Sequence, residues 1–274
     1  MTPTKRELFS LNLNEDIIKF QAILWNKYCD ARKRTLIDWP SEELKSSQLE
    51  FNNKITLYQK ENYSKWSPIL ALVREDMINQ GESISPVNFV NDCQFLRSLL
   101  KAHDWLIKQN YATNLALQSF IKNILVVDCD DLVACSSFKF LGTIIIAPKI
   151  TWCLADYVEN LIHEMSHIDL FIRQLIDPIV EKNVLLDSPF RKNKRPTIGV
   201  FHAAFVLSRV VKLLAALLND QYEAELTRFR LLNNYQNLIA ALDTLKNAPF
   251  LTNVAKMLLE EMTEHSLLYR EFVL

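Results

Sequence analysis

Two histidines, His163 and His167, stand four residues apart, and Glu164 directly follows the first. On a helix this spacing places both imidazoles on one face, one turn apart, where they can share a metal ion. In zinc hydrolases with this HExxH pattern, the glutamate activates a metal-bound water as general base. Two histidines can also merely satisfy polar groups on a buried helix, but unpaired polar groups are costly there. The motif therefore predicts a divalent metal site.

A third ligand is needed to complete such a site, and His202 is the best candidate among the five histidines. It lies in the otherwise apolar run 198–207, where a histidine needs a polar partner. Core histidines with one hydrogen bond are common, yet the HExxH motif favours metal ligation here. His103 and His265 are interpreted as structural residues at the surface or at helix ends.

The elements that must position these residues follow from hydrophobic periodicity. Apolar residues at three- and four-residue steps predict a helix over 152–176, which carries the motif, and another over 198–218. The β-branched runs 124–127 and 143–146 predict short strands before the motif helix. A polar loop with two prolines fills 183–197.

Helical patterns also cover 14–34, 41–61, 65–79 and 87–122, and continue beyond 218 with a break mainly at Pro249. The chain has only three glycines, which argues against tight hairpins and against glycine-rich phosphate loops. The sequence therefore predicts a mainly α fold with a small β element preceding the metal-binding helix.

The domain organisation that we expect is a single mainly helical domain over 1–274. Within it, 1–122 is a helical part that is a candidate for substrate recognition. The metal-site core spans 123–218, and a helical C-terminal part spans 219–274.

Charge and cysteine content narrow the function classes. Lys plus Arg number 31 and Asp plus Glu 32, so the basic excess of a nucleic-acid binder is missing. Five cysteines without CxxC spacing favour reduced thiols over a disulfide framework. The N-terminus has no apolar signal segment, and the apolar stretch 200–218 is too short and too charged to span a bilayer. We expect a cytoplasmic protein with neither nucleic-acid nor membrane partners.

Several short motifs occur in a recognisable order. They are Leu161-Ile162-His163-Glu164-Met165-Ser166-His167, Ser188-Pro189-Phe190-Arg191, Arg195-Pro196 and Gly199-Val200-Phe201-His202. Together they resemble the HExxH-type 2-oxoglutarate-dependent peptide β-hydroxylases. The likeness covers roughly 120–215 of the chain. It departs from the family pattern at Phe190, where tryptophan is usual, and at Ala203, where glycine is usual.

The resemblance implies an Fe(II) centre held by His163, His167 and His202, with 2-oxoglutarate and O2 as co-substrates. Arg191 and Arg195 match the family's arginines and are the candidates for binding the distal carboxylate of 2-oxoglutarate, because a guanidinium can grip a carboxylate with two hydrogen bonds. Oxidative decarboxylation of 2-oxoglutarate would then be coupled to hydroxylation of an unactivated carbon. Glu164 would orient a ligand or a water instead of acting as a base.

Two other readings stay open. In a zinc metallopeptidase, Glu164 would be the general base, and Glu223 or Glu225 would be the third Zn(II) ligand. In a helical interaction protein, the motif would be a relic that binds no metal. The sequence is compatible with several substrates of the same iron chemistry: a peptide, a carrier-bound or free amino acid, or a small natural-product intermediate.

Overall fold

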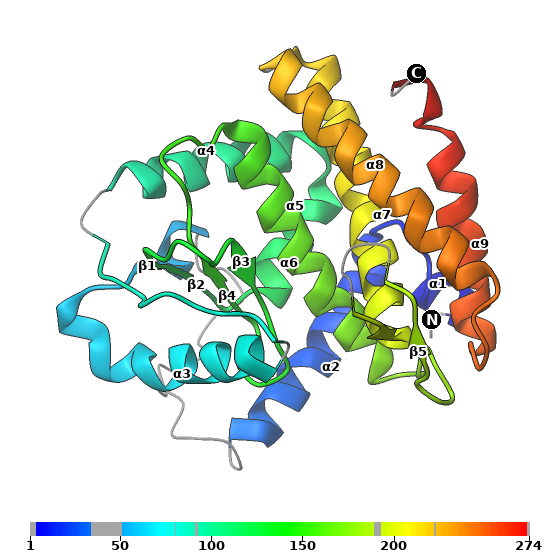
Figure 1. Ribbon diagram of the computed structural model, residues 1–274, viewed down its shortest axis with the longest axis horizontal. Helices are drawn as coiled ribbons and strands as arrows, with labels where there is room; N and C mark the ends of the chain where they lie inside the picture. The colour runs from blue at the N-terminus through cyan, green and yellow to red at the C-terminus, as the bar shows by residue number, and fades with distance from the viewer. Residues whose placement is uncertain are drawn as a thin grey trace. The chain divides into compact units, whose positions relative to one another are not determined.

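The computed structural model describes residues 4–33, 51–79, 81–90, 93–188, 193–221 and 223–272. The protein is mainly helical with a small sheet, as the sequence predicts (Figure 1). Its contacts divide the chain into two compact units, one formed by Met1–Ile17 with Cys153–Leu274 and one by Ile18–Trp152. The division falls inside the range 123–218 that was expected to form one metal-site core.

The unit Ile18–Trp152 is built on a four-stranded sheet of order β1-β2-β4-β3. Its strands are β1 (Ile55–Leu57), β2 (Asn123–Val126), β3 (Ala134–Cys135) and β4 (Thr143–Ile146). The strands β1, β2 and β4 are parallel, and β3 runs antiparallel to β4. Both strands predicted from β-branched runs are thus confirmed, to within one residue at each end.

The helix predicted over 41–61 is wrong where the chain is described, and 41–50 lie outside the described residues. Phe51–Lys54 form a single 3-10 turn, and Ile55–Leu57 form β1. Each residue of β1 pairs with one in β2, from Ile55 opposite Ile124 onward. Pairing with a strand distant in sequence has overridden the local helical pattern, as is common for short apolar segments.

The helices of this unit are α2 (Glu15–Lys33, whose first turn belongs to the other unit), α3 (Tyr63–Asn79), α4 (Gln94–Gln109) and α5 (Tyr111–Phe120), with a 3-10 turn at Lys60–Asn62. The predicted helix 87–122 begins only at Gln94 and is broken at Asn110. The Asn110 side chain accepts a hydrogen bond from the Ala112 amide at 2.7 Å, which caps α5. Helix α3 packs Trp66 and Leu70 against Leu125 of the sheet.

The unit with His163, His167 and His202 consists of helices around a central one, α7. Its elements are α1 (Lys5–Leu8), α6 (Leu154–Gln174), α7 (Thr197–Asn219), α8 (Ala224–Lys246), α9 (Asn253–Leu267), a 3-10 turn at Arg270–Phe272, and a hairpin of β5 (Leu185–Leu186) and β6 (Arg195–Pro196). Helix α7 contacts α6, α8 and α9. The two predicted core helices, 152–176 and 198–218, correspond to α6 and α7. The hairpin lies within the segment that was predicted as a polar loop.

The prediction that the stretch 200–218 is too short and too charged to span a bilayer is wrong, because helix α7 is long and apolar enough, by length and composition, to cross a membrane. However, 78% of its most apolar window is buried inside the structure. A helix surrounded by other helices must be apolar on every side, so its composition is explained by its position in the core.

The starts of α6 and α7 are fixed by side chains from other segments. The Leu154 amide at the start of α6 donates to the carboxylate of Glu223 at 3.1 Å, where the positive end of the helix dipole favours an anion. At the start of α7, the Ile198 amide donates to the side-chain oxygen of Asn183 at 3.0 Å. The hydroxyl of Thr197 donates to the Val184 carbonyl at 3.1 Å. Both histidine-bearing helices therefore begin at defined points.

Candidate metal centre

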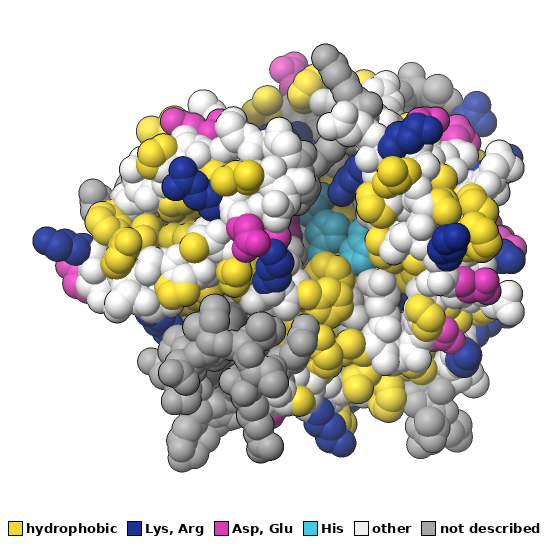
Figure 2. Space-filling view, turned by 60° about the horizontal axis from the view of Figure 1, so that its bottom comes forward, with side chains coloured by type: hydrophobic (Ala, Val, Ile, Leu, Met, Phe, Trp, Pro, Cys, Tyr) yellow, Lys and Arg dark blue, Asp and Glu magenta, His cyan; other side chains and the backbone are white. Residues whose placement is uncertain are grey.

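His163 and His167 lie on one face of α6, one turn apart, as their spacing predicts. Their Nε2 atoms are 3.2 Å from each other. With metal–nitrogen distances of about 2.1 Å, this separation corresponds to an angle of about 100° at a shared ion. Both side chains are half-buried, and histidine side chains are visible together at one place on the surface in Figure 2. This separation is compatible with a first-row divalent metal bound between the two Nε2 atoms.

His202 reaches the pair from α7 and is only 7% exposed. Its Nδ1 lies 3.0 Å from Nδ1 of His167, which is the ring nitrogen that faces away from His163. The Nε2 of His202 lies 2.8 Å from Nε2 of Gln174, two turns beyond His167 on α6. The three imidazoles and this amide therefore form a hydrogen-bonded chain, which we call the histidine chain.

The electrostatics of the histidine chain favour neutral rings. Burial lowers the pKa of His163 to about 4. Burial and the positive charge of Arg195 lower the pKa of His202 to about 3. Burial, with further contributions from the two neighbouring histidines and Arg195, lowers the pKa of His167 well below its ordinary value. Neutral imidazoles are the form that binds metals, because each then keeps a lone pair on one nitrogen.

The spacing suits a shared metal ion for His163 and His167 but not for all three histidines. Within the described ranges, no group of three or more His, Cys, Asp or Glu side chains is arranged to hold a metal ion. The reason is visible in the histidine chain: His167 faces His163 with Nε2 and His202 with Nδ1, so the three rings do not converge on one point. The structure brings His202 to the site, and its role as a third ligand remains a proposal.

Arg195 in β6 places a cation beside the histidines. A methyl group added at Gly199, in the first turn of α7, would lie 3.5 Å from an Nη atom of Arg195, so the guanidinium rests over this glycine. Its charge contributes to the lowered pKa of both His167 and His202. A guanidinium in this position can pair with the carboxylate of a small anionic co-substrate. Arg191, the other predicted arginine, lies outside the described residues.

The three candidate glutamates lie in different places. Glu164 is buried, at 4% exposure, on the motif helix. Glu223 binds the first turn of α6 at Leu154, nine residues before His163 and therefore about 13 Å along the helix axis. Glu225 is exposed in the first turn of α8. The structure thus does not bring Glu223, the first alternative third ligand for zinc, to the histidine pair.

The prediction for the two remaining histidines is confirmed for one and wrong for the other. His265 lies in the last turn of α9, as predicted. The prediction of a surface or helix-end position is wrong for His103, which is 8% exposed within α4. Its ring stacks on Phe51, with centroids 3.9 Å apart, and contacts the side-chain oxygen of Asn114 at 3.3 Å.

Two members of the site were missed from the sequence, Gln174 and Phe171. The Phe171 ring lies against His202, with centroids 4.8 Å apart. Phe171 follows His167 by four residues and Gln174 follows it by seven. Both therefore lie on the same face of α6 as His163 and His167. Extending the helical face of the motif by two further turns would have found them.

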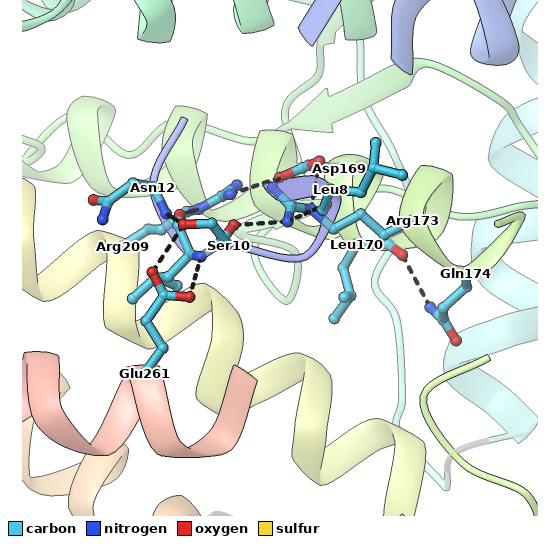
Figure 3. Close-up of polar contacts among 10 residues, drawn as sticks. Leu8, Ser10, Asn12, Asp169, Leu170, Arg173, Gln174, Arg209 and Glu261 are labelled. Atoms are coloured by element: carbon cyan, nitrogen blue, oxygen red, sulfur yellow. Dashed lines mark hydrogen bonds and ion pairs between the residues drawn. The ribbon is translucent and has the colours of Figure 1, made fainter. Parts of the chain in front are cut away.

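A second buried polar cluster joins the same two helices, and we call Asp169, Arg173 and Arg209 the charged cluster (Figure 3). Asp169 on α6 is fully buried and accepts two hydrogen bonds from Arg173 at 3.0 Å each. Its second oxygen also pairs with Arg209 of α7 at 2.6 Å. Burial would raise the pKa of Asp169, but the two guanidinium groups hold the pKa below its ordinary value.

The charged cluster also binds the N-terminal segment 8–12. Arg173 donates to the carbonyls of Leu8 and Ser10 at 2.8 and 2.7 Å, and Arg209 donates to that of Leu11 at 3.1 Å. Glu261 of α9 accepts hydrogen bonds from the Ser10 hydroxyl at 2.9 Å and the Leu11 amide at 2.7 Å. The helices that carry the histidines are therefore tied to each other and to the start of the chain.

Comparison with known proteins gives no family. No protein-family model matches the chain, and the search of curated proteins found no match. The functional argument accordingly rests on the residues of the site.

Proposed function

We propose that this protein is an Fe(II)- and 2-oxoglutarate-dependent oxygenase that hydroxylates an unactivated carbon of an amino acid in a peptide, on a carrier or free. The observation that carries the proposal is the Nε2–Nε2 separation of 3.2 Å between His163 and His167, with a third imidazole adjoining the pair. Imidazole ligands suit iron, and two fixed ligands leave open positions for co-substrates.

The chain's own residues have separate roles in this proposal. His163 and His167 hold the metal through Nε2, and His202 is the third imidazole of the site. Iron(II), when bound, supplies oxygen activation, so that 2-oxoglutarate, O2 and a C–H bond become succinate, CO2 and a C–OH group. Glu164, buried on the same helix, orients a metal ligand or a water.

Arg195 binds the distal carboxylate of 2-oxoglutarate in this proposal. Its guanidinium rests over Gly199, and its charge already acts on His167 and His202. A charge-assisted hydrogen bond of this kind contributes about 1.5–3 kcal/mol, which is roughly a 10- to 100-fold change in affinity.

The test of the function is anaerobic reconstitution with Fe(II), followed by O2 and measurement of succinate formed from 2-oxoglutarate, with and without candidate amino-acid and peptide substrates. We expect succinate from the wild-type protein and none above background from His163→Ala. Stoichiometric zinc in the isolated protein, together with peptide cleavage and no succinate, would instead support a metallopeptidase. Absence of metal and of both activities would support an interaction protein.

The test of Arg195 is its replacement by methionine, which keeps the length of the side chain and removes its charge. We expect the KM for 2-oxoglutarate to rise roughly 10- to 100-fold, with iron affinity changed much less. Lys194→Met is the matched control, because Lys194 is 61% exposed and pairs with Asp187 at 3.4 Å. Equal KM values for the two variants would remove Arg195 from the binding of 2-oxoglutarate.

A further inference from the structure

The side-chain amide of Gln174 makes two contacts through the same nitrogen. Its Nε2 lies 3.3 Å from the carbonyl oxygen of Leu170 and 2.8 Å from Nε2 of His202. A carbonyl oxygen only accepts hydrogen bonds, so the amide end at this position is the NH2 group. An NH2 group has two hydrogens, so it can donate to the Leu170 carbonyl and also to His202 Nε2.

This donor determines the direction of every hydrogen bond in the histidine chain. A neutral imidazole donates with one nitrogen and accepts with the other. Nε2 of His202 accepts from Gln174, so the proton of His202 is on Nδ1, which donates to Nδ1 of His167. The proton of His167 is then on Nε2 and is directed at Nε2 of His163.

We propose that Gln174 is a positioning residue of the metal site, which fixes the hydrogen-bond direction through His202 and His167 and thereby sets how readily the His163–His167 pair accepts a metal ion. The part of this inference that concerns metal affinity rests on the proposed function, in which His163 and His167 bind the metal, whereas the part that concerns proton positions does not. The supporting geometry is the set of three consecutive contacts of 2.8, 3.0 and 3.2 Å.

The consequence for metal binding follows from proton positions. A metal bound to both Nε2 atoms needs the lone pair of His167 Nε2, where the histidine chain places a proton. Moving that proton to Nδ1 of His167 makes Nδ1 a donor toward His202, whose own proton must then move to Nε2. That atom already faces an N–H group of Gln174, so two donors would oppose each other. The Gln174 amide therefore disfavours the metal-ready arrangement.

Two substitutions keep the length of the Gln174 side chain and change its hydrogen bonding. They therefore distinguish an effect of hydrogen-bond direction from an effect of side-chain shape. Gln174→Glu replaces the donor by an acceptor, which reverses the histidine chain and leaves His167 Nε2 without a proton. Gln174→Met removes the donor and provides no acceptor. Ile176→Glu adds the same charge two residues further along and keeps the amide, so it controls for charge alone.

The first measurement is the 15N NMR spectrum of metal-free protein labelled at histidine, because the shifts of Nδ1 and Nε2 report which nitrogen carries the proton. In the wild type we expect the proton of His202 on Nδ1 and that of His167 on Nε2, and in Gln174→Glu the opposite. Gln174→Met should show a mixture. A merely structural role for Gln174 would leave these positions unchanged, and that result overturns the proposal.

The second measurement is the affinity for Co(II) or Zn(II), by titration of the metal-free protein. Outer partners of metal-ligating histidines typically change affinity 10- to 100-fold. We expect Gln174→Glu to bind at least about 10-fold more tightly than the wild type, Gln174→Met to lie between them, and Ile176→Glu to stay within about threefold of the wild type. Equal gains in Gln174→Glu and Ile176→Glu would show an effect of charge alone and overturn the proposal.

Failure of this inference and failure of the proposed function give different results. If the Gln174 variants shift protons and metal affinity while the iron protein makes no succinate, the positioning role stands and the oxygenase proposal fails. If the wild type makes succinate while the Gln174 variants change neither proton positions nor affinity, only the role of Gln174 fails.

Discussion

The histidine chain and the charged cluster join the same two helices, α6 and α7, by opposite physical means. The charged cluster holds a carboxylate between two guanidinium groups, with side-chain exposures of 0%, 1% and 6% for Asp169, Arg173 and Arg209. The histidine chain contains only neutral rings and an amide. One cluster holds charges that persist to low pH, and the other uses groups that can donate or accept a hydrogen bond at either nitrogen.

The difference teaches which part of the interface is structural and which is adaptable. A buried charge must keep its partners, because an unpaired one costs several kcal/mol. The arginines of the charged cluster accordingly donate hydrogen bonds to the main-chain carbonyls of Leu8, Ser10 and Leu11 in addition to their ion pairs with Asp169 (Figure 3). Imidazoles can exchange donor and acceptor roles, so the helix pair is held by one cluster while the other remains able to bind a ligand.

The largest effect is expected when the charged cluster is broken. Asp169→Ala leaves Arg173 and Arg209 buried without their carboxylate, and removal of one partner from a buried ion pair costs about 3–5 kcal/mol. Urea denaturation should show this loss in the free energy of unfolding. The control is Asp177→Ala, which removes the pair of Asp177 with Lys5 at 2.7 Å, where the lysine is 73% exposed. Surface pairs contribute only about 0–1 kcal/mol. Similar losses in both variants would contradict the contrast.

The two clusters should lose their contributions to the free energy of unfolding at different pH values. The pKa of His202 is lowered from 6.5 to about 3 by burial, with a contribution from Arg195. Below pH 6.5 the unfolded chain binds a proton that the folded protein resists, so stability is complete above pH 6.5 and falls as the pH decreases. The loss from His202 by pH 4 is on the order of 3 kcal/mol. We expect His202→Gln to lose less stability over this range, measured by urea denaturation at each pH.

The charged cluster should respond only at lower pH. The pKa of Asp169 is depressed below 3.8, so its contribution is complete above pH 3.8 and is lost as the pH falls through the folded value. Asp169→Asn should therefore leave the slope of stability against pH between 6.5 and 4 unchanged. A flattened slope in Asp169→Asn, with none in His202→Gln, would reverse the assignment of the two clusters.

The smallest effect concerns Glu261, which binds the N-terminal segment beside the charged cluster. Glu261→Ala removes acceptors for the Ser10 hydroxyl and the Leu11 amide. Hydrogen bonds to a charged group contribute about 1.5–3 kcal/mol, and a neutral one about 0.5–1.5 kcal/mol. We expect Glu261→Ala to lower the free energy of unfolding more than Ser10→Ala, which removes one of the two bonds to Glu261 and a longer, exposed one that the Ser10 hydroxyl accepts from the Asn12 amide at 3.2 Å. Metal affinity should stay unchanged in both variants, and a loss of affinity would show that the two clusters are coupled.

The sequence alone determined the two helices that carry the site and the histidine pair, His163 and His167, on the first of them. Periodic apolar residues encode which face of α6 and α7 is buried, and a four-residue spacing places His163 beside His167 whatever surrounds the helix. The Ile-rich runs of β2 and β4 were readable for the same local reason. A polar residue in an apolar helix, taken together with the HExxH motif, selected His202 for the site.

The tertiary structure decided what depends on contacts between distant segments. The strand β1 exists because it pairs with β2 about 70 residues later, which no local pattern encodes. The bonds of the charged cluster to the carbonyls of Leu8, Ser10 and Leu11 form only where the start of the chain meets α6 and α7. Which nitrogen of His202 faces His167, and the partnership with Gln174, depend on how the two helices pack and on side-chain torsions. Spacing in the sequence brings the rings together, but packing orients them.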